Sequence, residues 1–184
     1  FSMFYRHTLE SSESGLIPLS QELEQTRRYL TIEKARFGDD RIIESEHVSE
    51  GIGKLLVPSF VIQPIVENAV RHAMRDAGPL SIDVHAVIDG DDVLIAVADD
   101  GLGMTEEAAQ RLLGSGGDDA APTPVGSGRN RGAGMALKNV MERIERFYDP
   151  GSGVEVVSRP GEGTCVTLRL CGAATELAAI AEED

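Results

Sequence analysis

The stretch SFVIQPIVENAVRHAMRD, from Ser59 to Asp76, decides the fold that we expect for this chain. Apolar residues recur in it every three or four positions, which predicts a helix that buries one face. These residues are Ile62, Ile65, Val66, Ala69, Val70 and Ala73. The opposite face carries Asn68, Arg71, His72 and Arg75. A carboxamide, two guanidinium groups and an imidazole can contact a phosphorylated ligand and its metal, although the same face can also be solvated.

The segments on both sides of this helix alternate between helical and strand patterns. Upstream, Ser20 can cap a helix that Gly38 ends, and Pro58 marks the entry to the central helix. Strands are expected at residues 41–48, 80–88, 93–98, 154–158 and 164–170, and further helices at residues 105–113 and 137–147. Strands that cluster as antiparallel pairs with helices on one face predict an α+β fold. We expect an α/β sandwich of two layers, with a mixed, mainly antiparallel sheet and a helical segment before it.

The composition of the 184 residues favours a single domain with a substantial core. A net charge of −14 argues against a nucleic-acid surface, because such binding rests on clustered lysines and arginines. A bound nucleotide would therefore need a cation or a few placed arginines to offset this field. No apolar run approaches the roughly 20 residues of a membrane span. Cys165 and Cys171 lie in one predicted strand, too far apart to bridge, which favours a reducing, cytosolic setting.

A buried strand is expected to end at Asp99-Asp100-Gly101-Leu102-Gly103. A carboxylate at the floor of a pocket accepts a hydrogen bond from an exocyclic amine, and glycines let a flat base approach the backbone closely. A tight acidic turn has much the same sequence. The motif alone therefore leaves both interpretations open.

Residues 114–131, GSGGDDAAPTPVGSGRNR, show no periodicity, which is typical of a mobile functional segment. Gly132 and Gly134 follow it, just before or in a helix N-terminus, where N–H groups and the helix dipole attract an anion. The nearby side chains of Arg129, Arg131 and Lys138 favour phosphate at this place. A simple hinge would explain the glycines without a ligand.

Asn68 supplies a neutral oxygen that suits a hard cation such as Mg²⁺, whose other ligands are usually waters and substrate phosphates. Glu67 sits beside it and could accept or orient a proton. The alternative for Glu67 is an ion pair with Arg71, one turn later on the helix. The alternative for His72 is a ring that only packs at the edge of the apolar face.

Together these stretches resemble the ATP-binding domain of histidine kinases in the GHKL superfamily. The run VENAVRH is similar to the N box, VADDGLG to the first glycine box, RGAGMALKN to the second and GEGT to the closing turn. The segment LSQELEQTRRYLTIEKARFGDDRI, together with VPSFVIQPIVENAVRHA, resembles the LytS-type sensor kinases more specifically. The resemblance covers nearly the whole chain.

The resemblance implies a Bergerat-type fold that binds ATP and Mg²⁺. Asn68 would hold the metal against the phosphates, Asp99 would bind the adenine amine, and Glu67 and Asn68 would be the catalytic residues. Residues 114–131 would form the ATP lid. The other nucleotide contacts would come from Arg71, His72, Arg75, Gly101, Gly103, Arg131, Gly132, Gly134, Lys138 and Thr164.

Two positions depart from the family pattern. The first glycine box usually reads Asp-Asn-Gly, and here Asp100 adds negative charge. The second box usually carries a further glycine where this chain has Ala136, whose methyl group would narrow the approach to the phosphates. Both changes predict a modest ATP affinity.

The histidine that accepts phosphate is expected outside this chain. Kinases of this type carry it in a segment similar to H-F-x-F-N, a context that none of the chain's histidines has. We expect residues 1–38 to end a helical dimerisation region, 39–172 to form the catalytic domain and 173–184 to form an acidic, frayed tail. The resemblance implies a homodimeric parent anchored in the membrane, with this domain in the cytoplasm and a response regulator as partner.

Three other functions are compatible with such a fold. ATP hydrolases of the MutL and gyrase type use a glutamate one turn before the metal asparagine, and this chain has Pro64 there, which cannot polarise water. A non-catalytic interaction module would retain the fold around a vestigial pocket, an alternative that Asp100 and Ala136 leave open. A serine kinase of the anti-sigma-factor type would phosphorylate another protein.

Overall fold

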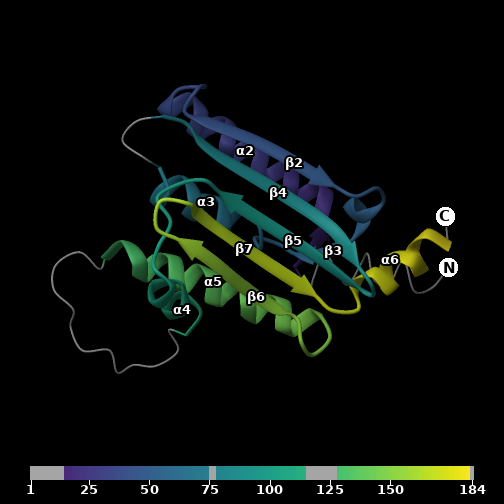
Figure 1. Cartoon of the computed structure of the whole chain (residues 1–184). Coiled ribbons are helices and arrows are strands. Elements are labelled where there is room, and N and C mark those ends of the chain that lie inside the picture. The colour runs from purple at the N-terminus through teal and green to yellow at the C-terminus, as the bar shows by residue number, and fades with distance from the viewer. Residues whose placement is uncertain (1–14, 75–77, 115–127, 183–184) are drawn as a thin grey trace.

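The computed structural model describes residues 15–74, 78–114 and 128–182. Within these ranges the chain forms a layer of helices on a five-stranded sheet with the strand order β2-β4-β5-β7-β6 (Figure 1). The strands are β2 (Ile42–Val48), β4 (Leu80–Asp89), β5 (Asp92–Asp99), β6 (Gly153–Arg159) and β7 (Gly163–Leu170). The strand β2 runs parallel to β4, and the other three pairs are antiparallel. The predicted mixed, mainly antiparallel sheet is therefore confirmed.

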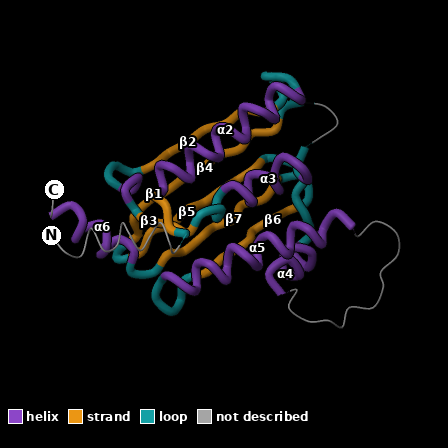
Figure 2. Tube along the Cα trace, turned by 180° about the vertical axis from the view of Figure 1, so that it is seen from behind, coloured by secondary structure: helices purple, strands orange, loops and turns teal. Residues whose placement is uncertain are grey.

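Three long helices cover one face of the sheet, and Figure 2 shows α3 between α2 and α5. They are α2 (Leu19–Phe37), α3 (Gln63–His72) and α5 (Gly128–Phe147), with α4 (Glu106–Gly114) packed beside α5. The central strand β5 turns Val93, Ile95 and Val97 toward these helices, and all three are almost fully buried. We call this side of the sheet the helix-covered face.

Helix α2 shares its hydrophobic core with the sheet. Its residues Leu19, Leu23 and Leu30 are buried in the same cluster as the apolar side chains of β4, β5 and β7. The end of α2 is as expected, because Gly38 takes a positive φ of 112° and donates its N–H to the Lys34 carbonyl. The division of the chain at residue 38 stays a prediction about a longer parent protein.

Helix α3 is shorter than the predicted helix at residues 59–76. It starts at Gln63, and the residues before it form a turn in which Phe60 has a φ of 60°, a conformation that a right-handed helix excludes. It ends at His72, and the expected continuation at residues 75–76 lies outside the described residues. The six apolar residues predicted for its buried face are at most 7% exposed, so this part of the prediction is confirmed.

The predicted N-cap of helix α2, Ser20, is wrong. The helix begins at Leu19 with Pro18 as its N-cap, so Ser20 lies inside the first turn and does not cap it. Pro18 is the last residue of strand β1 (Leu16–Pro18), which pairs with β3 (Leu56–Pro58) in a small second sheet. The short 3-10 helix η1 (Ile52–Lys54) precedes β3 in the chain. Strands of three residues are too short to show periodicity.

The C-terminal segment also differs from the expected frayed tail. Residues Ala173–Glu182 form helix α6, in which Ala173 is fully buried and Leu177 is 9% exposed. Alanine has the highest helix propensity, and these two apolar residues give the helix a face to bury. Both cysteines are free, as expected. None of the helices in the described ranges is long and apolar enough to cross a bilayer.

Candidate functional site

Asp99 ends strand β5 on the helix-covered face of the sheet. It continues the alternation of Val93, Ile95 and Val97 and is half-buried. Burial raises the pKa of Asp99, against the opposing effect of hydrogen bonds from the N–H groups of Gly101, at 3.0 Å, and Thr164. A carboxylate has about four acceptor positions, so capacity remains for a ligand donor.

The loop after β5 packs against the end of α3. The N–H of Leu102 donates to the carbonyl oxygen of Ala73 over 3.1 Å. A methyl group added at Gly101 would overlap Ala73, and one added at Gly103 would overlap the carbonyl of Arg159. Both glycines are therefore required by close contacts within the protein, in addition to any role beside a base.

Ser158 in β6 holds the other side of this loop. Its hydroxyl accepts the Met104 N–H at 2.9 Å, lies 2.9 Å from the Gly163 carbonyl oxygen, and lies 2.8 Å from the Thr164 hydroxyl. Thr164 is also the register partner of Asp99 in the pairing of β5 with β7. The predicted closing residue therefore lies next to the predicted base-binding carboxylate.

Helix α3 presents its polar residues beside this loop. Asn68 is half-buried, and its carboxamide takes no part in the hydrogen bonds found among the described residues. Glu67 is half-buried and accepts a hydrogen bond from the Gln63 carboxamide at 2.8 Å, so its partner is Gln63 rather than Arg71. Arg71 is exposed, and His72 is the half-buried last residue of the helix.

The contact at Ala73 brings Asp99 and Asn68 into one region. Ala73, the C-cap of α3, lies little more than one turn after Asn68 and binds the loop that follows Asp99. Both side chains belong to elements on the helix-covered face. The loop after Asp99 and the helix of Asn68 are therefore neighbours, and a common site for the two side chains stays a prediction.

Helix α5 begins earlier than its sequence suggested. It starts at Gly128, so Gly132 and Gly134 lie in its second turn rather than ahead of it. N–H groups beyond the first four residues of a helix bond to carbonyls of the same helix, so the free N–H groups expected at these two glycines are absent from this described helix. The apolar positions Leu137, Val140 and Ile144 pack the helix onto the sheet, and the helix continues backward from them.

Several predicted contacts cannot be placed in the site. Residues 115–127, which make up most of the predicted lid, lie outside the described residues, as do Arg75 and the side chain of Arg131. Lys138 is exposed on α5, with its Nζ 3.9 Å from a Glu142 carboxylate oxygen.

The oxygen atoms available at Asn68 suit a metal ion that takes most of its ligands from water and a bound nucleotide. No group of three or more histidines, cysteines, aspartates and glutamates is arranged for a metal within the ranges described. A magnesium ion at Asn68 would take one protein oxygen and complete its shell with phosphate oxygens and waters, as this ion commonly does. The residues present therefore fit Mg²⁺ bound together with a nucleotide.

Comparison with known proteins agrees with this geometry. Residues 56–173 match the family described as "Histidine kinase-, DNA gyrase B-, and HSP90-like ATPase". The chain belongs to this ATPase family. Residues 1–42 match a second family, described as "Histidine kinase".

Among curated proteins, the chain is similar to the sensor protein LytS of two bacilli. It is 32% identical to the Bacillus anthracis protein over 168 residues, which are 91% of this chain and 27% of the relative. It is 29% identical to the Bacillus subtilis protein over 170 residues, 92% of this chain and 27% of the relative. The chain thus spans about a quarter of the length of these relatives.

Solved structures support the same ATPase fold. The histidine kinase domain of the blue-light activated kinase from Erythrobacter litoralis EL346 superposes with a TM-score of 0.52 at 16% identity, covering 89% of this chain and 65% of that one. The histidine kinase AdeS of Acinetobacter baumannii gives 0.52 at 11% identity, covering 85% of this chain and 66% of that one. At these identities the likeness concerns the fold alone.

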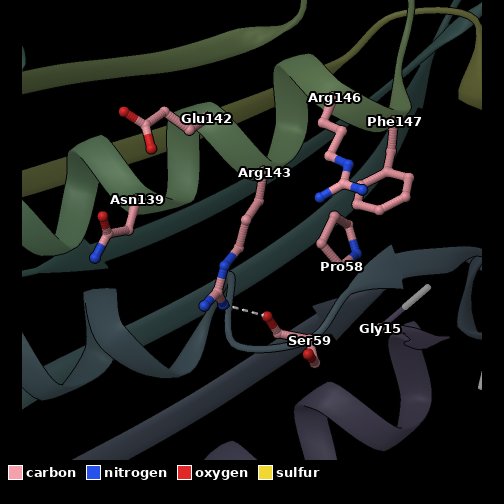
Figure 3. A pocket seen from close by; sticks show the side chains of 8 residues that line it. All are labelled: Gly15, Pro58, Ser59, Asn139, Glu142, Arg143, Arg146 and Phe147. Atoms are coloured by element: carbon pink, nitrogen blue, oxygen red, sulfur yellow. Dashed lines mark hydrogen bonds between the residues drawn. The ribbon is translucent and has the colours of Figure 1, made fainter. Parts of the chain in front are cut away.

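A cavity of about 650 Å³ lies away from the ATPase site, between the second half of α5 and the small sheet (Figure 3). Neither Asp99 nor Asn68 lines it. Its walls include Pro58, Ser59, Asn139, Glu142, Arg143, Arg146 and Phe147.

Sequence motifs missed three polar residues, Glu22, Arg143 and Ser158, which hold the turn before α3 and the loop after β5 in place. Glu22 was detectable, because it falls among the buried positions of α2 beside Leu19, Leu23 and Thr26. An acidic residue on an apolar stripe indicates a buried, hydrogen-bonded carboxylate. Arg143 and Ser158 carried no comparable signal.

Proposed function

We propose that this chain is the catalytic and ATP-binding domain of a two-component sensor histidine kinase. It would bind Mg-ATP and transfer the γ-phosphoryl group to a histidine outside the chain, from which a response regulator would take it. The match to the ATPase family, the match of residues 1–42 to the histidine kinase family and the similarity to proteins named sensor protein LytS support this function.

One observation carries the proposal: a half-buried carboxylate ends a central strand directly beside the helix of a half-buried asparagine. Asp99 would accept the exocyclic amine N–H of adenine, as a charge-assisted hydrogen bond. Asn68 would hold Mg²⁺, which offsets phosphate charge when it is bound. In a chain with a net charge of −14, such a local offset is needed for a nucleotide to bind.

The other roles follow the same arrangement. Glu67 would accept or orient a proton of the incoming imidazole, and His72 would lie along the nucleotide. Thr164, Gly101 and Gly103 would border the base. Phosphate contacts would come from Arg71, Arg75, Arg131 and Lys138, whereas the N–H groups of Gly132 and Gly134 are engaged within α5. In phosphoryl transfer the protein mainly positions groups and stabilises charge, so these residues need no covalent chemistry of their own.

The chain would work beside an upstream dimerisation and phosphoacceptor region of the same parent. We propose a homodimeric parent that is anchored in the membrane and keeps this domain in the cytoplasm, with residues 39–172 as the catalytic unit. ATP hydrolysis as the main activity is disfavoured, because Pro64 occupies the first turn of α3 where hydrolases carry a glutamate.

Calorimetry with Mg-ATP tests the proposal. The wild-type chain should bind one Mg-ATP, and Asp99→Ala and Asn68→Ala should each weaken or abolish binding while circular dichroism shows a folded protein. A folded wild-type chain that does not bind would favour the non-catalytic interaction module. In the parent protein, phosphate found on serine of a partner rather than on histidine would favour the anti-sigma-factor type of kinase.

A further inference from the structure

A buried carboxylate of α2 binds the turn that starts α3. Glu22 is 0% exposed and accepts four backbone N–H groups of this turn. Its Oε2 accepts the N–H of Phe60 at 3.0 Å, and its Oε1 accepts those of Val61 at 2.9 Å, Ile62 at 3.0 Å and Gln63 at 3.3 Å. One side chain therefore satisfies the N–H groups of the turn before α3 and of the first residue of the helix, Gln63.

Helix α3 has no cap of its own. Its N-cap residue, Ile62, has no side-chain acceptor, and Pro64 in the first turn has no N–H to donate. The first N–H groups of a helix lack partners within the helix and form the positive end of its dipole. Glu22 supplies both the missing acceptor and a complementary charge, from a position forty residues earlier in the chain.

The same turn is held from its other side by α5. The Nη1–H group of Arg143 donates to the carbonyl oxygen of Ser59 at 2.6 Å (Figure 3). The same nitrogen also lies 3.2 Å from the carbonyl oxygen of Phe60, to which it donates. Phe60 is the residue with the φ of 60°, and a bulky side chain adopts this conformation only where its surroundings impose it. The turn thus joins α2, α3 and α5 through one carboxylate and one guanidinium group.

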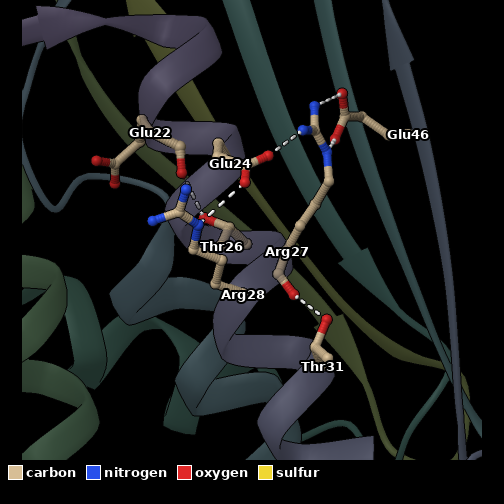
Figure 4. Close-up of polar contacts among 7 residues, drawn as sticks. All are labelled: Glu22, Glu24, Thr26, Arg27, Arg28, Thr31 and Glu46. Carbon is tan, nitrogen blue, oxygen red and sulfur yellow. Dashed lines mark hydrogen bonds and ion pairs between the residues drawn. The ribbon is translucent and has the colours of Figure 1, made fainter.

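Glu22 differs from its neighbour Glu24 on the same helix. Glu24 is exposed and pairs with Arg27 at 2.9 Å and with Arg28 at 3.0 Å. Arg27 also pairs with Glu46 of β2 at 3.0 Å. Figure 4 shows the Glu22 carboxylate directed away from this surface network. Glu24 is therefore a natural control for the loss of a charge at Glu22.

Helix α2 stays in contact with α3 beyond this turn. Thr26 is buried one turn after Glu22 and donates its hydroxyl to the Glu22 carbonyl at 3.0 Å. Burial raises the pKa of Tyr29 to about 12, and the charge of Glu67 on α3 adds to the shift while that of Arg71 opposes it. Helices α2 and α3 are in contact on the helix-covered face, so the Glu22 contact is part of a longer interface between them.

We propose that Glu22 is a positioning residue that couples α2 to the nucleotide site. Four N–H groups share its carboxylate, so a shift of α2 must move the start of α3 and with it Asn68. The segment that matches the histidine kinase family, residues 1–42, includes the whole of α2. This inference rests on the ATP binding proposed above and names the contact through which upstream motion would change it.

Glu22→Gln tests the coupling with little change in size. One end of the carboxamide can still accept N–H groups, but its NH₂ group faces a backbone donor instead of an acceptor. The dissociation constant for Mg-ATP, measured by calorimetry at a temperature where the variant is fully folded, should rise about tenfold, within the usual range of coupling between sites. Glu24→Gln should leave this constant unchanged.

A second comparison separates coupling from general stability. Leu177→Ala in α6 removes core contacts remote from α3 and should lower the melting temperature without changing the dissociation constant. If Glu22→Gln lowers the melting temperature but binds Mg-ATP as the wild type does, Glu22 only stabilises the fold and the inference is overturned.

Amide hydrogen exchange on the wild-type chain provides a test that does not depend on any variant folding. Coupling is reciprocal, so Mg-ATP should slow exchange at the N–H groups of Val61 and Ile62, which Glu22 binds. Binding without any change at these amides would refute the coupling and leave the ATP site intact. A wild-type chain that does not bind Mg-ATP would instead refute the proposed function, and the coupling with it.

Discussion

The backbone N–H of Leu102 donates to the carbonyl oxygen of Ala73 over 3.1 Å, and this bond joins the two parts of the proposed nucleotide site. Leu102 lies in the loop that follows Asp99, and Ala73 ends the helix that carries Asn68. The space beside Gly101 is occupied by Ala73. Backbone contacts rather than flexible side chains therefore set the separation between the carboxylate and the carboxamide.

Substitution of Gly101 should show how closely these segments are packed. The methyl group of Gly101→Ala would overlap Ala73, so we expect the free energy of unfolding to fall by about 1–3 kcal/mol, as in other overpacked sites. Gly153→Ala is a matched control, because nothing lies within 4 Å of its added methyl group. Urea unfolding of both variants measures the difference in the free energy of unfolding. Equal values would show that the loop after β5 shifts to accommodate the methyl group without a loss of stability.

Asp99→Asn should weaken nucleotide binding without unfolding the protein. The change replaces a charge-assisted hydrogen bond to adenine by a weaker neutral one, and an affinity loss of at least about tenfold is expected. Calorimetry with Mg-ATP measures this loss.

The adjacent Asp100 provides the control for that variant. It is exposed and accepts the Ser81 N–H at 2.8 Å, a bond that Asp100→Asn can keep. This variant also restores the usual residue of the family motif, so its affinity should equal or exceed that of the wild type. A loss as large as that of Asp99→Asn would show that the base-binding carboxylate is wrongly assigned.

The layers of this fold were predictable because they follow from local periodicity. The apolar run at Val93–Ala98 predicted an interior strand, and β5 is the central strand, with Val93, Ile95 and Val97 buried on one face and the other face half-buried. The spacing of Ile65, Val66, Ala69 and Val70 gave the buried face of α3. Asp99 and Asn68 could be assigned to a site because each stands in a recognisable motif.

The exact ends of the helices were not predictable in this way. Residues 60–62 continue the apolar pattern of α3, but the buried Glu22 binds their N–H groups and holds them in a turn. This hydrogen bonding joins positions far apart in the sequence, which no window of neighbouring residues contains. At α5 the two glycines suggested a later start, and the packing of the following turns outweighs their low helix propensity.

The isolated chain should not transfer phosphate from ATP to any histidine in the part of the chain that the structure describes. His47 and His85 are exposed register partners whose rings stack with centroids 4.8 Å apart. His85 lies between the buried residues Val84 and Ala86 and so points away from the helix-covered face, where the proposed nucleotide site lies. Incubation with radiolabelled Mg-ATP, followed by a test for acid-labile phosphate, should give no labelled histidine. A stable phosphohistidine on this chain would contradict the prediction.

Asn68→Ala should remove the part of the affinity that depends on magnesium. In the wild type, Mg²⁺ should tighten ATP binding, because the ion links Asn68 to the phosphates. In the variant, ATP should bind almost equally well with Mg²⁺ and with a chelator present. Gln110→Ala, which deletes an exposed carboxamide on α4, should keep the wild-type response to Mg²⁺. An unchanged magnesium effect in Asn68→Ala would assign the metal to another residue.

Acid should weaken adenine binding through Asp99. Burial raises the pKa of this carboxyl group, and the amine donor of adenine favours its ionised form, so binding must compete with protonation.

The affinity should therefore be constant above the pKa of the free site and fall by up to about tenfold per pH unit below it. The contribution of Asp99 to folding stability depends on pH in the opposite direction. A carboxyl group whose pKa is higher in the folded than in the unfolded state favours folding at low pH, and this contribution is lost as the pH rises through the folded pKa.

Calorimetry with adenosine, which has no titrating phosphate, measures the effect between about pH 8 and about pH 5. Asp99→Asn, which has no proton to take up at this position, should bind weakly and without this pH dependence. A wild-type affinity that stays constant through the whole range would mean that the Asp99 carboxylate does not contact the base.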